Sequence, residues 1–346
     1  MSSATHINTS TASTASTAAT AATTRAIRLS CFGGPEVMQL VDVDLPPPGA
    51  GEAQVRHAAI GLNFIDVYHR TGLYPQPLPA GLGMEGAGVV EAVGEGVTEV
   101  KVGDRVAYAG GPIGAYAQAR NLPAAQLLVL PEKIGFDTAA AMMLQGLTVQ
   151  YLLHRTVPLK AGDTIVFHAA AGGVGLIACQ WAKVLGVTLI GTVGSAEKAA
   201  LAIAHGADHV INYNEENFTE RVREITGGKG VRAVYDSIGK DTFIPSLDCL
   251  APLGTMVSFG NASGPVESFA LAELANRGSL FVTRPSMRAY LSTRTELEAA
   301  AQSLFGVVNS GAVKVEVRQR YALADVAQAH IDLESRKTVG STILLP

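Results

Sequence analysis

One stretch of the sequence, TIVFHAAAGGVG at residues 164–175, constrains the fold more than any other. A short apolar run leads there into alanines and glycines, and a helical pattern, GVGLIACQWAKVLG, follows at once. Ala170, Gly172 and Gly175 occupy the three special positions of the pattern G-x-G-x-x-G, with alanine in place of the first glycine. Between a strand and a helix, this pattern indicates a dinucleotide-binding fold rather than a generic glycine-rich turn.

The glycines have a physical purpose in such a turn. A Cβ atom at Gly172 would collide with a bound pyrophosphate, and the missing Cβ of Gly175 lets the helix pack against the strand. The helix N-terminus then offers unpaired N–H groups and a positive dipole end to the phosphates. We therefore expect this stretch to bind a dinucleotide.

Strands and helices alternate around this motif. We expect strands at residues 164–169, 187–193, 209–213, 232–238, 254–260 and 279–286. Helices are expected to begin near Gly173, Ala196, Glu216, Thr242 and Ala270. Apolar, β-branched strands that alternate with helices are typical of a doubly wound parallel sheet, and six of them suit the Rossmann fold, so the predicted class is α/β.

The chain before residue 130 has a different pattern. Short alternating strands and turns such as GGPE and PPPGAG predict a β-rich, barrel-like domain from Arg25 onwards. A helix over residues 136–155 is expected to start at an Asp137 cap, and another to start at Ser292 or Thr293. The chain after Lys314 alternates again, and we expect it to return to the first domain.

Composition excludes several classes of protein. Of the 346 residues, 48% are hydrophobic and 16% are charged, which indicates a compact globular chain. The net charge of -4 does not favour nucleic acid as the main partner, and no apolar run is long enough for a membrane helix. The three cysteines, at positions 31, 179 and 249, suit a reducing compartment, so a cytoplasmic location is predicted. Residues 1–24, mostly Ser, Thr and Ala, predict a disordered tail.

The end of the second expected strand indicates which dinucleotide binds. Sites for NAD carry an acidic residue there, which bonds the ribose 2′-hydroxyl. The sequence is GTVGSAEK, so Thr192 to Ser195 hold no carboxylate and Lys198 is close by. Glu197 can point to solvent from the start of its helix. Unless Lys198 is only a surface charge, this pattern favours NADPH over NADH.

The sequence resembles the quinone oxidoreductase and ζ-crystallin branch of the medium-chain dehydrogenases/reductases, its bacterial NADPH:quinone oxidoreductases most of all. The resemblance covers residues 25–346 and is carried by GDTIVFHAAAGGVGLIACQWAK, GGPEVMQL, GLNFIDVYHRTGLYP, GVVEAVGEGV, GDRVAY, YDSIG and VSFGNASG. The matching positions in the first of these are Gly162, Asp163, Ala170, Ala171, Gly172, Gly173, Gly175, Gln180 and Lys183.

This resemblance implies a GroES-like β-barrel catalytic domain at residues 25–147, a Rossmann NADPH-binding domain at 148–287, and a return to the catalytic domain at 288–346. It also implies a homodimer joined along the edge strand SLFVTRPS. The implied NADPH contacts are Asn63, Tyr68, Gln145, Thr148, Gly172, Gly173, Val174, Gly194, Ser195, Lys198, Tyr213, Ser237, Phe259, Gly260, Ser263 and Arg336. Gln145 is a departure, because some relatives have lysine there.

A metal site is not expected. Zinc alcohol dehydrogenases share this architecture and need Cys, His and carboxylate ligands. Their GHE stretch is Gly83-Met84-Glu85 in this chain, and methionine cannot replace the imidazole ligand. His57 and His69 have no thiolate partner at ligand spacing, and no cysteine lies between residues 31 and 179.

Metal-free chemistry suits a quinone, which is electron-poor and can spread the charge of an added hydride over its ring. Asn63 and Tyr74 are the candidate catalytic residues, as an uncharged donor and a hydroxyl proton donor, although Tyr74 could also be a packing residue. His168 is expected to be structural, and Asp66 to cap a helix or bond within a loop. Two other functions remain open: reduction of an α,β-unsaturated carbonyl, and a cofactor-binding crystallin-like or RNA-binding role.

Overall fold

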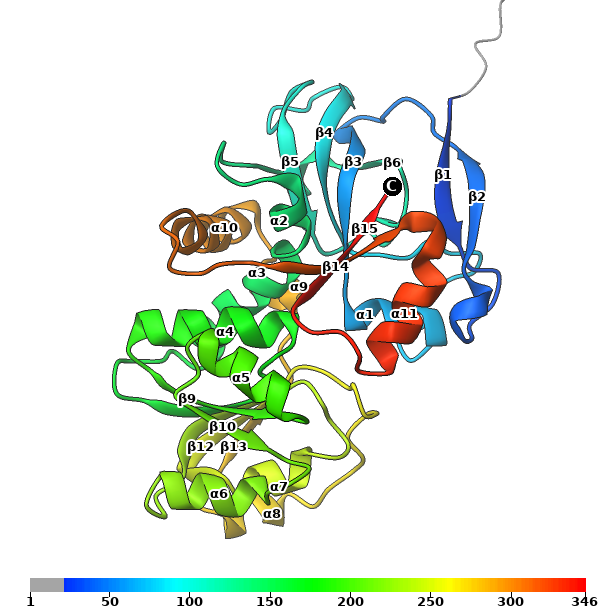
Figure 1. Ribbon diagram of the computed structural model, residues 1–346. Coiled ribbons are helices and arrows are strands. Elements are labelled where there is room, and N and C mark those ends of the chain that lie inside the picture. The colour runs from blue at the N-terminus through cyan, green and yellow to red at the C-terminus, as the bar shows by residue number, and fades with distance from the viewer. Residues whose placement is uncertain (1–21) are drawn as a thin grey trace, which may run out of the picture.

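The computed structural model of the protein describes residues 22–346. The predicted disordered tail therefore lies outside the described residues, apart from its last positions. Thr23 and Thr24, which the sequence assigned to the tail, begin strand β1 (Thr23–Arg28), and the Thr24 hydroxyl accepts a hydrogen bond from Ala119 N at 3.0 Å. The chain forms a sheet-and-helix unit and a barrel-like unit, drawn in the lower and upper parts of Figure 1.

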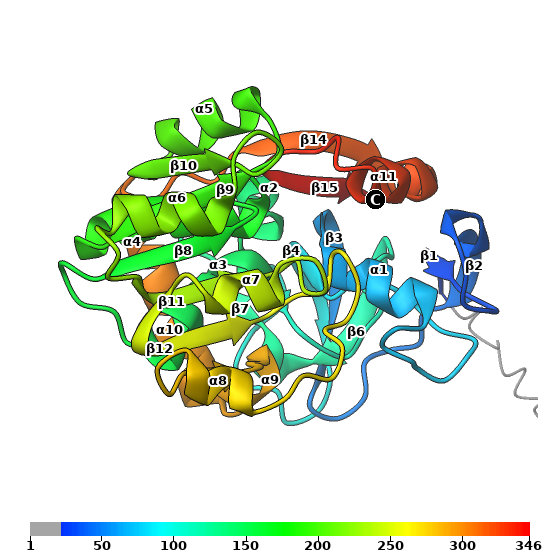
Figure 2. The ribbon, with the colours of Figure 1, turned by 90° about the horizontal axis from the view of Figure 1, so that it is seen from below.

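The lower unit contains the predicted Rossmann sheet. Its six strands are all parallel and lie in the order β10-β9-β8-β11-β12-β13. Figure 2 shows β10, β9, β8, β11 and β12 in this order from below. The strands are β8 (Thr164–His168), β9 (Thr188–Val193), β10 (His209–Asn212), β11 (Val231–Asp236), β12 (Leu250–Ser258) and β13 (Phe281–Thr283). The predicted fold class is confirmed, and the strand order reverses between β8 and β11, the point where such sheets bind ligands.

Helices cover both faces of this sheet. They are α4 (Gly173–Leu185), α5 (Ala196–Ala204), α6 (Phe218–Ile225), α7 (Phe243–Leu247) and α8 (Ala272–Asn276). Successive residues of β8 point into different cores: Ile165 and Phe167 pack with α4, and Val166 packs with α6 and α7. Burial on both faces explains why the strands are continuously apolar.

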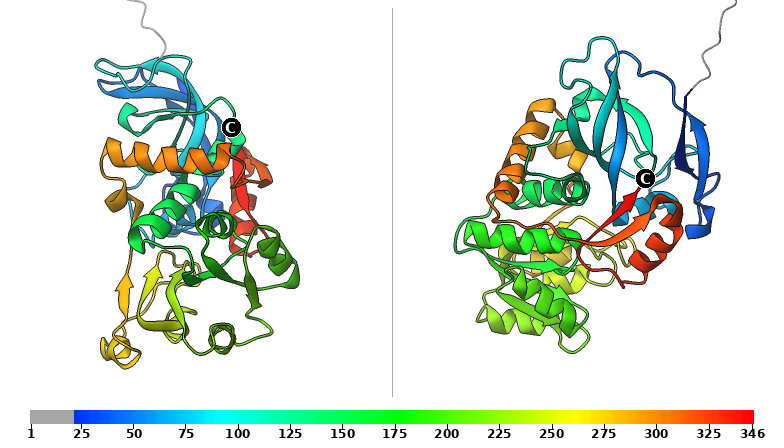
Figure 3. Two further views of the ribbon diagram at one scale, coloured as in Figure 1. Left: turned by 90° about the vertical axis from the view of Figure 1, so that its left-hand side faces the viewer. Right: turned by 45° about the horizontal axis from the view of Figure 1, so that its top comes forward.

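The upper unit is a seven-stranded sheet in the order β14-β15-β3-β4-β5-β7, with β6 paired to β3. Its strands are β3 (Glu52–Leu62), β4 (Glu85–Val93), β5 (Arg105–Ala109), β6 (Ala119–Pro123), β7 (Leu128–Val129), β14 (Val317–Ala322) and β15 (Ser341–Leu345). Strand β2 (Gln39–Asp44) pairs with β1 beside it. In Figure 3 the red C-terminal strand β15 lies next to β3, so the end of the chain joins this sheet.

Further helices surround the barrel-like unit and its junction with the Rossmann sheet. They are α1 (Phe64–Thr71), α2 (Phe136–Ala140), α3 (Met143–Tyr151), α9 (Met287–Tyr290), α10 (Arg294–Asn309) and α11 (Val326–Glu334). Short 3-10 turns lie at Pro35–Val37, Ala124–Gln126 and Leu323–Asp325, and a π-helical turn, Leu152–Thr156, follows α3. None of the helices within residues 22–346 has both the length and the apolarity needed to cross a membrane.

The predicted helix over residues 136–155 is wrong in two respects. The segment is divided into α2, α3 and the π-helical turn, because α2 packs on β3 and β4 whereas α3 packs on α4 and α10. Asp137 does not cap it: the N-cap is Gly135, and the Asp137 carboxylate pairs with Arg320 at 3.1 Å. Of the two predicted caps of α10, Ser292 and Thr293, the structure selects Thr293: its hydroxyl accepts a bond from Glu296 N, and its own N–H donates to the Glu296 carboxylate. The expected boundaries at 147/148 and 287/288 fall inside α3 and α9.

Candidate active site

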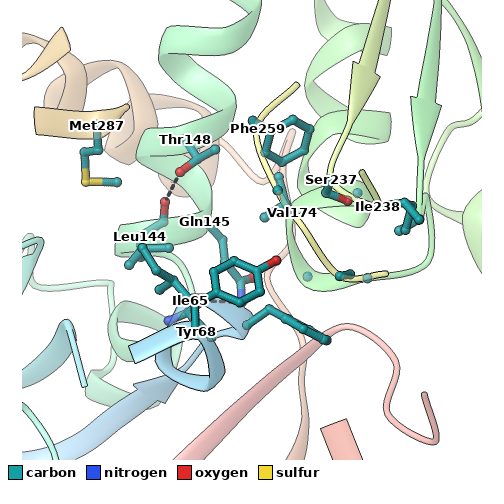
Figure 4. Close-up of a pocket in the computed structure, with 18 of the residues that line it drawn as sticks. Ile65, Tyr68, Leu144, Gln145, Thr148, Val174, Ser237, Ile238, Phe259 and Met287 are labelled. Atoms are coloured by element: carbon teal, nitrogen blue, oxygen red, sulfur yellow. Dashed lines mark hydrogen bonds between the residues drawn. The ribbon is translucent and has the colours of Figure 1, made fainter. Parts of the chain in front are cut away.

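A cleft of about 1690 Å³ lies between the barrel-like unit and the carboxyl ends of the Rossmann strands. Most of the predicted site residues line it: Asn63, Tyr68, Tyr74, Gln145, Thr148, Gly172, Gly173, Val174, Gly194, Lys198, Tyr213, Ser237, Phe259, Gly260 and Arg336. Figure 4 shows Tyr68 and Gln145 on one wall, and Ser237 and Ile238 on the other. The structure thus brings together residues from both units.

Two predicted residues lie outside this cleft. The Ser195 hydroxyl caps α5 by accepting a bond from Lys198 N, and Ser195 lines a smaller adjacent cavity of about 470 Å³. The Ser263 hydroxyl donates to Ile238 O at 3.0 Å and accepts from Asp241 N at 3.1 Å, so it holds a loop in place.

The first part of the wall is the bare turn before α4. Gly172 is the N-cap of this helix, no side chain caps it, and residues 172–175 line the cleft. A Cβ on Gly175 would lie 2.4 Å from Ala169 O, so the close packing of helix and strand requires glycine there. A Cβ on Gly173 would lie 2.2 Å from Gln145 Oε1, so Gln145 rests directly against the turn.

A cation follows the end of β9, in the first turn of α5. Lys198 lines the cleft, and its ammonium group donates to Arg336 O at 2.8 Å. Burial, and then the charge of Arg336, lower the pKa of Lys198 from its usual value. Glu197 is fully exposed and lines only the smaller cavity. This end of the cleft therefore presents positive charge to a ligand.

Two tyrosines of the barrel-like unit bond to loops of the Rossmann unit. The Tyr68 hydroxyl accepts a bond from Asn261 N at 2.7 Å, and the Tyr74 hydroxyl accepts one from Arg284 Nη2 at 2.9 Å. Arg284 also donates to Ser258 Oγ and Gly260 O. Sequence reasoning missed Asn261 and Arg284. Asn261 follows the expected strand at residues 254–260, and Arg284 lies near the carboxyl end of the expected strand at 279–286, where ligand-binding residues gather.

A chain of buried hydrogen bonds joins two residues of the cleft wall, Asn63 and Gln145, to residues behind it. Ser341 Oγ donates to Gln145 Oε1 at 2.8 Å, and Gln145 Nε2 donates to Asn63 Oδ1 at 3.2 Å. Asn63 Nδ2 donates to Glu85 Oε2 at 2.6 Å, and Leu144 N donates to Glu85 Oε1 at 2.9 Å. We call this chain, from Ser341 through Gln145 and Asn63 to Glu85, the amide relay.

Two buried carboxyl groups lie at this end of the cleft. Glu85 and Asp66 are fully buried. Burial raises the pKa of Glu85 to about 8 and that of Asp66 to about 7, because the charged form loses its hydration. The Asp66 carboxylate accepts bonds from Asn63 N and the Tyr116 hydroxyl, both at 2.9 Å. A role for Glu85 was missed at the sequence level, although its charge stands out in an apolar strand.

Comparison with known proteins places this cleft in a family. Residues 49–132 match the alcohol dehydrogenase GroES-like domain, and residues 173–303 match the zinc-binding dehydrogenase family. The chain is 57% identical to the quinone oxidoreductase of Pseudomonas aeruginosa over 93% of its own length and 99% of that protein. The protein belongs to the quinone oxidoreductase family of the medium-chain dehydrogenases/reductases.

Two further similarities bear on the cleft of this quinone oxidoreductase family member. The structure of Escherichia coli quinone oxidoreductase complexed with NADPH has 54% sequence identity and a TM-score of 0.92, covering 94% of this chain and 100% of that one. The 2-haloacrylate reductase of a Burkholderia species is 47% identical over 91% of this chain and 96% of that protein. The predicted family is thus confirmed.

The zinc-binding name of the matched family raises the question of a metal. Among residues 22–346 no group of three or more His, Cys, Asp or Glu is arranged to hold a metal ion. His57 is buried, with its ring nitrogens 2.6 Å from Ala117 O and 2.8 Å from the Tyr108 hydroxyl, and burial lowers its pKa to about 4. His69 Nδ1 lies 3.2 Å from Tyr74 O.

His168 also serves the fold. It is buried, and its ring nitrogens lie 2.8 Å from the hydroxyls of Thr192 and Ser246. Both nitrogens are therefore occupied, although the residue borders the cleft. This arrangement agrees with the expectation that His168 is structural.

Proposed function

We propose that this protein is an NADPH-dependent, zinc-independent quinone oxidoreductase. The nucleotide end of the cleft carries the proposal: the N-terminus of α4 and Lys198 line the same cleft, and no acidic residue stands between Thr192 and Ser195. The NADPH complex of the similar Escherichia coli enzyme supports this choice of cofactor. The three free cysteines, Cys31, Cys179 and Cys249, also suit a reducing, cytoplasmic location.

The residues present fit NADPH. The N–H groups at the start of α4 would hold the pyrophosphate, where the helix dipole favours anions. Lys198 would hold the 2′-phosphate, and Arg336 lies near enough to share it, since its carbonyl oxygen already bonds the lysine. Gln145 and Thr148 of α3, together with Tyr68, would border the nicotinamide half.

At the barrel end, the protein's task is to place the quinone and keep water out. When bound, NADPH supplies a hydride, and one proton from solvent or a hydroxyl completes the hydroquinone. Asn63 can donate a hydrogen bond to a carbonyl oxygen without changing its charge. Tyr74 can donate the proton, because Arg284 Nη2 lies 2.9 Å from its oxygen and stabilises the negative charge left behind. Both side chains border the cleft.

A steady-state acceptor screen with NADPH and NADH tests this function. We expect turnover of 1,4-benzoquinones or 1,4-naphthoquinones, with NADPH strongly preferred. Absence of turnover across such a panel, or a preference for NADH, would contradict the proposal.

A second function is favoured by one comparison. The 47% identity to a 2-haloacrylate reductase suggests reduction of an activated carbon–carbon double bond, with the hydride delivered to the β carbon. The same cleft could orient such a substrate through Asn63. Turnover of a quinone and a 2-alkenal, measured side by side, separates the two, and a large preference for the alkenal selects this second function.

We also propose a homodimer formed through β13. This strand is the edge of the Rossmann sheet, and Phe281 and Val282 expose 59% and 37% of their surface. An exposed apolar edge strand is a ready surface for pairing with a second copy. Light scattering of the protein and of Phe281→Lys tests this, with a monomeric variant expected.

A further inference from the structure

Glu85 is the last residue of the amide relay, and its carboxylate only accepts hydrogen bonds. Each of its oxygens accepts a bond, one from Asn63 Nδ2 and one from Leu144 N. Every donor in the relay therefore points toward the carboxylate. The relay side chains are all buried, with Asn63, Gln145 and Ser341 exposed by 7%, 6% and 3%, so water does not compete for these bonds.

We propose that Glu85 is a positioning residue, whose carboxylate fixes which ends of the Asn63 and Gln145 amides face the ligand. An amide is nearly symmetric in shape, so packing alone does not choose between its oxygen and its nitrogen. The choice comes from the hydrogen bonds, and a carboxylate that only accepts gives the relay one direction. The inference rests on the contact roles proposed for Asn63 and Gln145.

The Glu85→Gln substitution would reverse the relay rather than break it. The backbone donor Leu144 N cannot turn round, so the new amide must keep its oxygen there and turn its NH2 group to Asn63. Asn63 then has to offer Oδ1 to that group, and its Nδ2 has to face Gln145. Gln145 in turn offers Oε1 to Asn63 and donates to Ser341 Oγ. The number of hydrogen bonds is kept, so the fold should survive while the ligand-facing donors and acceptors change places.

A protonated Glu85 can act in the same way as the amide. Burial raises its pKa to about 8, so its two forms coexist near neutral pH. The ionisable groups that face it are Asp66, Tyr108, Tyr116 and the nearby His57. Burial raises the pKa of both tyrosines and lowers that of His57 to about 4. Asp66, with a pKa of about 7, is thus the one among them that titrates in the same range.

The test compares E85Q/D66N with D66N, so that Asp66 does not contribute. Titration with NADPH, followed by its fluorescence, gives the dissociation constant at pH 6.5 and pH 9.5. At the lower pH both proteins carry a neutral group at position 85, and we expect equal affinity. At the higher pH we expect E85Q/D66N to bind about tenfold more weakly, since mismatched buried polar groups cost roughly 1–3 kcal/mol. If the ratio of the two dissociation constants, E85Q/D66N over D66N, does not change with pH, the proposal is overturned.

Two measurements keep the test decisive. Should E85Q/D66N fail to fold, D66N alone must gain about tenfold in affinity for NADH between pH 7 and 9.5, because NADH has no 2′-phosphate and does not respond to the charge of Lys198; a flat profile overturns the proposal. Asn63→Ala and Gln145→Ala test the contact roles themselves. If neither substitution weakens NADPH binding, both the contact roles and the inference about Glu85 are wrong. If both weaken it while the E85Q/D66N ratio stays at one, only the role of Glu85 is wrong, and the proposed function stands.

Discussion

At the nucleotide end of the cleft the backbone forms the surface, whereas at the barrel end buried side chains from distant segments form it. The turn before α4 is local: strand, glycines and helix follow one another within residues 164–185. The amide relay instead joins β4, the start of α1, α3 and β15. The nucleotide end depends on glycines that have no side chain, so a larger residue in the turn should disturb it. The barrel end is specified by hydrogen-bond direction, so changes there should alter binding and rate more than folding.

The largest effect is expected at the nucleotide end. Gly175→Val should lower the free energy of unfolding by about 3 kcal/mol or more, because its Cβ would lie 2.4 Å from the Ala169 carbonyl oxygen, an overpacked backbone contact. Gly306→Ala is the matched control: nothing lies within 4 Å of its Cβ position inside α10, so it should gain up to about 1 kcal/mol. Urea unfolding measures both, and a mild Gly175→Val would show that the turn is not tightly constrained.

The charge beside the turn should decide the cofactor. Lys198→Ala should weaken NADPH binding by roughly 30-fold, the loss of a charge-assisted contact of about 2 kcal/mol, and leave NADH binding within about twofold. Lys337→Ala is the control, because Lys337 lines only the smaller cavity and should change either affinity little. Equal losses for NADPH and NADH in Lys198→Ala would remove this lysine from the 2′-phosphate site.

A substitution at the barrel end should lower the catalytic rate, kcat, rather than cofactor affinity. Tyr74→Phe removes the proposed proton donor, and we expect kcat with a quinone to fall by about tenfold, with NADPH affinity unchanged. This loss is below the roughly 100-fold or more that is usual for general acid catalysis, because solvent can also supply the proton. Tyr321→Phe serves as the comparison, since the Tyr321 hydroxyl bonds Asp332 at 2.8 Å away from the cleft. A Tyr74→Phe enzyme with the kcat of the parent would make Tyr74 a packing residue.

The smallest effect concerns pH and stability at the barrel end. The pKa of Glu85 is raised to about 8 on folding, so in the range between its unfolded value and 8 the native state binds more protons than the unfolded state. Stability must then fall as pH rises, by about 1 kcal/mol from this group between pH 7 and 8. When the free energy of unfolding is measured by urea unfolding at pH 7 and pH 8, Glu85→Gln should lack this part of the decrease. Glu296→Gln should keep it, because the pKa of Glu296 is lowered to about 2. If stability falls equally with pH in the parent and in Glu85→Gln, the raised pKa assigned to Glu85 is wrong.

The sequence predicted the nucleotide end well for a physical reason. Its strand, turn and helix are adjacent in the chain, so periodicity and the Gly172–Gly175 spacing carry the information locally. The Rossmann sheet was predicted correctly on this basis, and the family was predicted correctly from a resemblance that this stretch carries together with motifs elsewhere in the chain. Lys198 lies at the expected place beside the turn.

The barrel end was predicted less completely, because its contacts depend on tertiary packing. Asn63 and Gln145 were expected to contact ligand, but their bonds to each other and to Glu85 join residues far apart in the chain. Asn261 and Arg284 were missed for the same reason. Asp137 looked like a helix cap, yet the position of Arg320 on β14 gave it another partner.

The most direct test of the account is a single-turnover measurement. The protein is loaded with NADPH, mixed with 1,4-benzoquinone, and followed by the loss of nicotinamide fluorescence and the appearance of hydroquinone. The account predicts tight uptake of NADPH and one hydroquinone formed for each NADPH oxidised, with NADH taken up far more weakly. No uptake of NADPH, or a catalytic rate that depends on an added or bound transition metal, would contradict it.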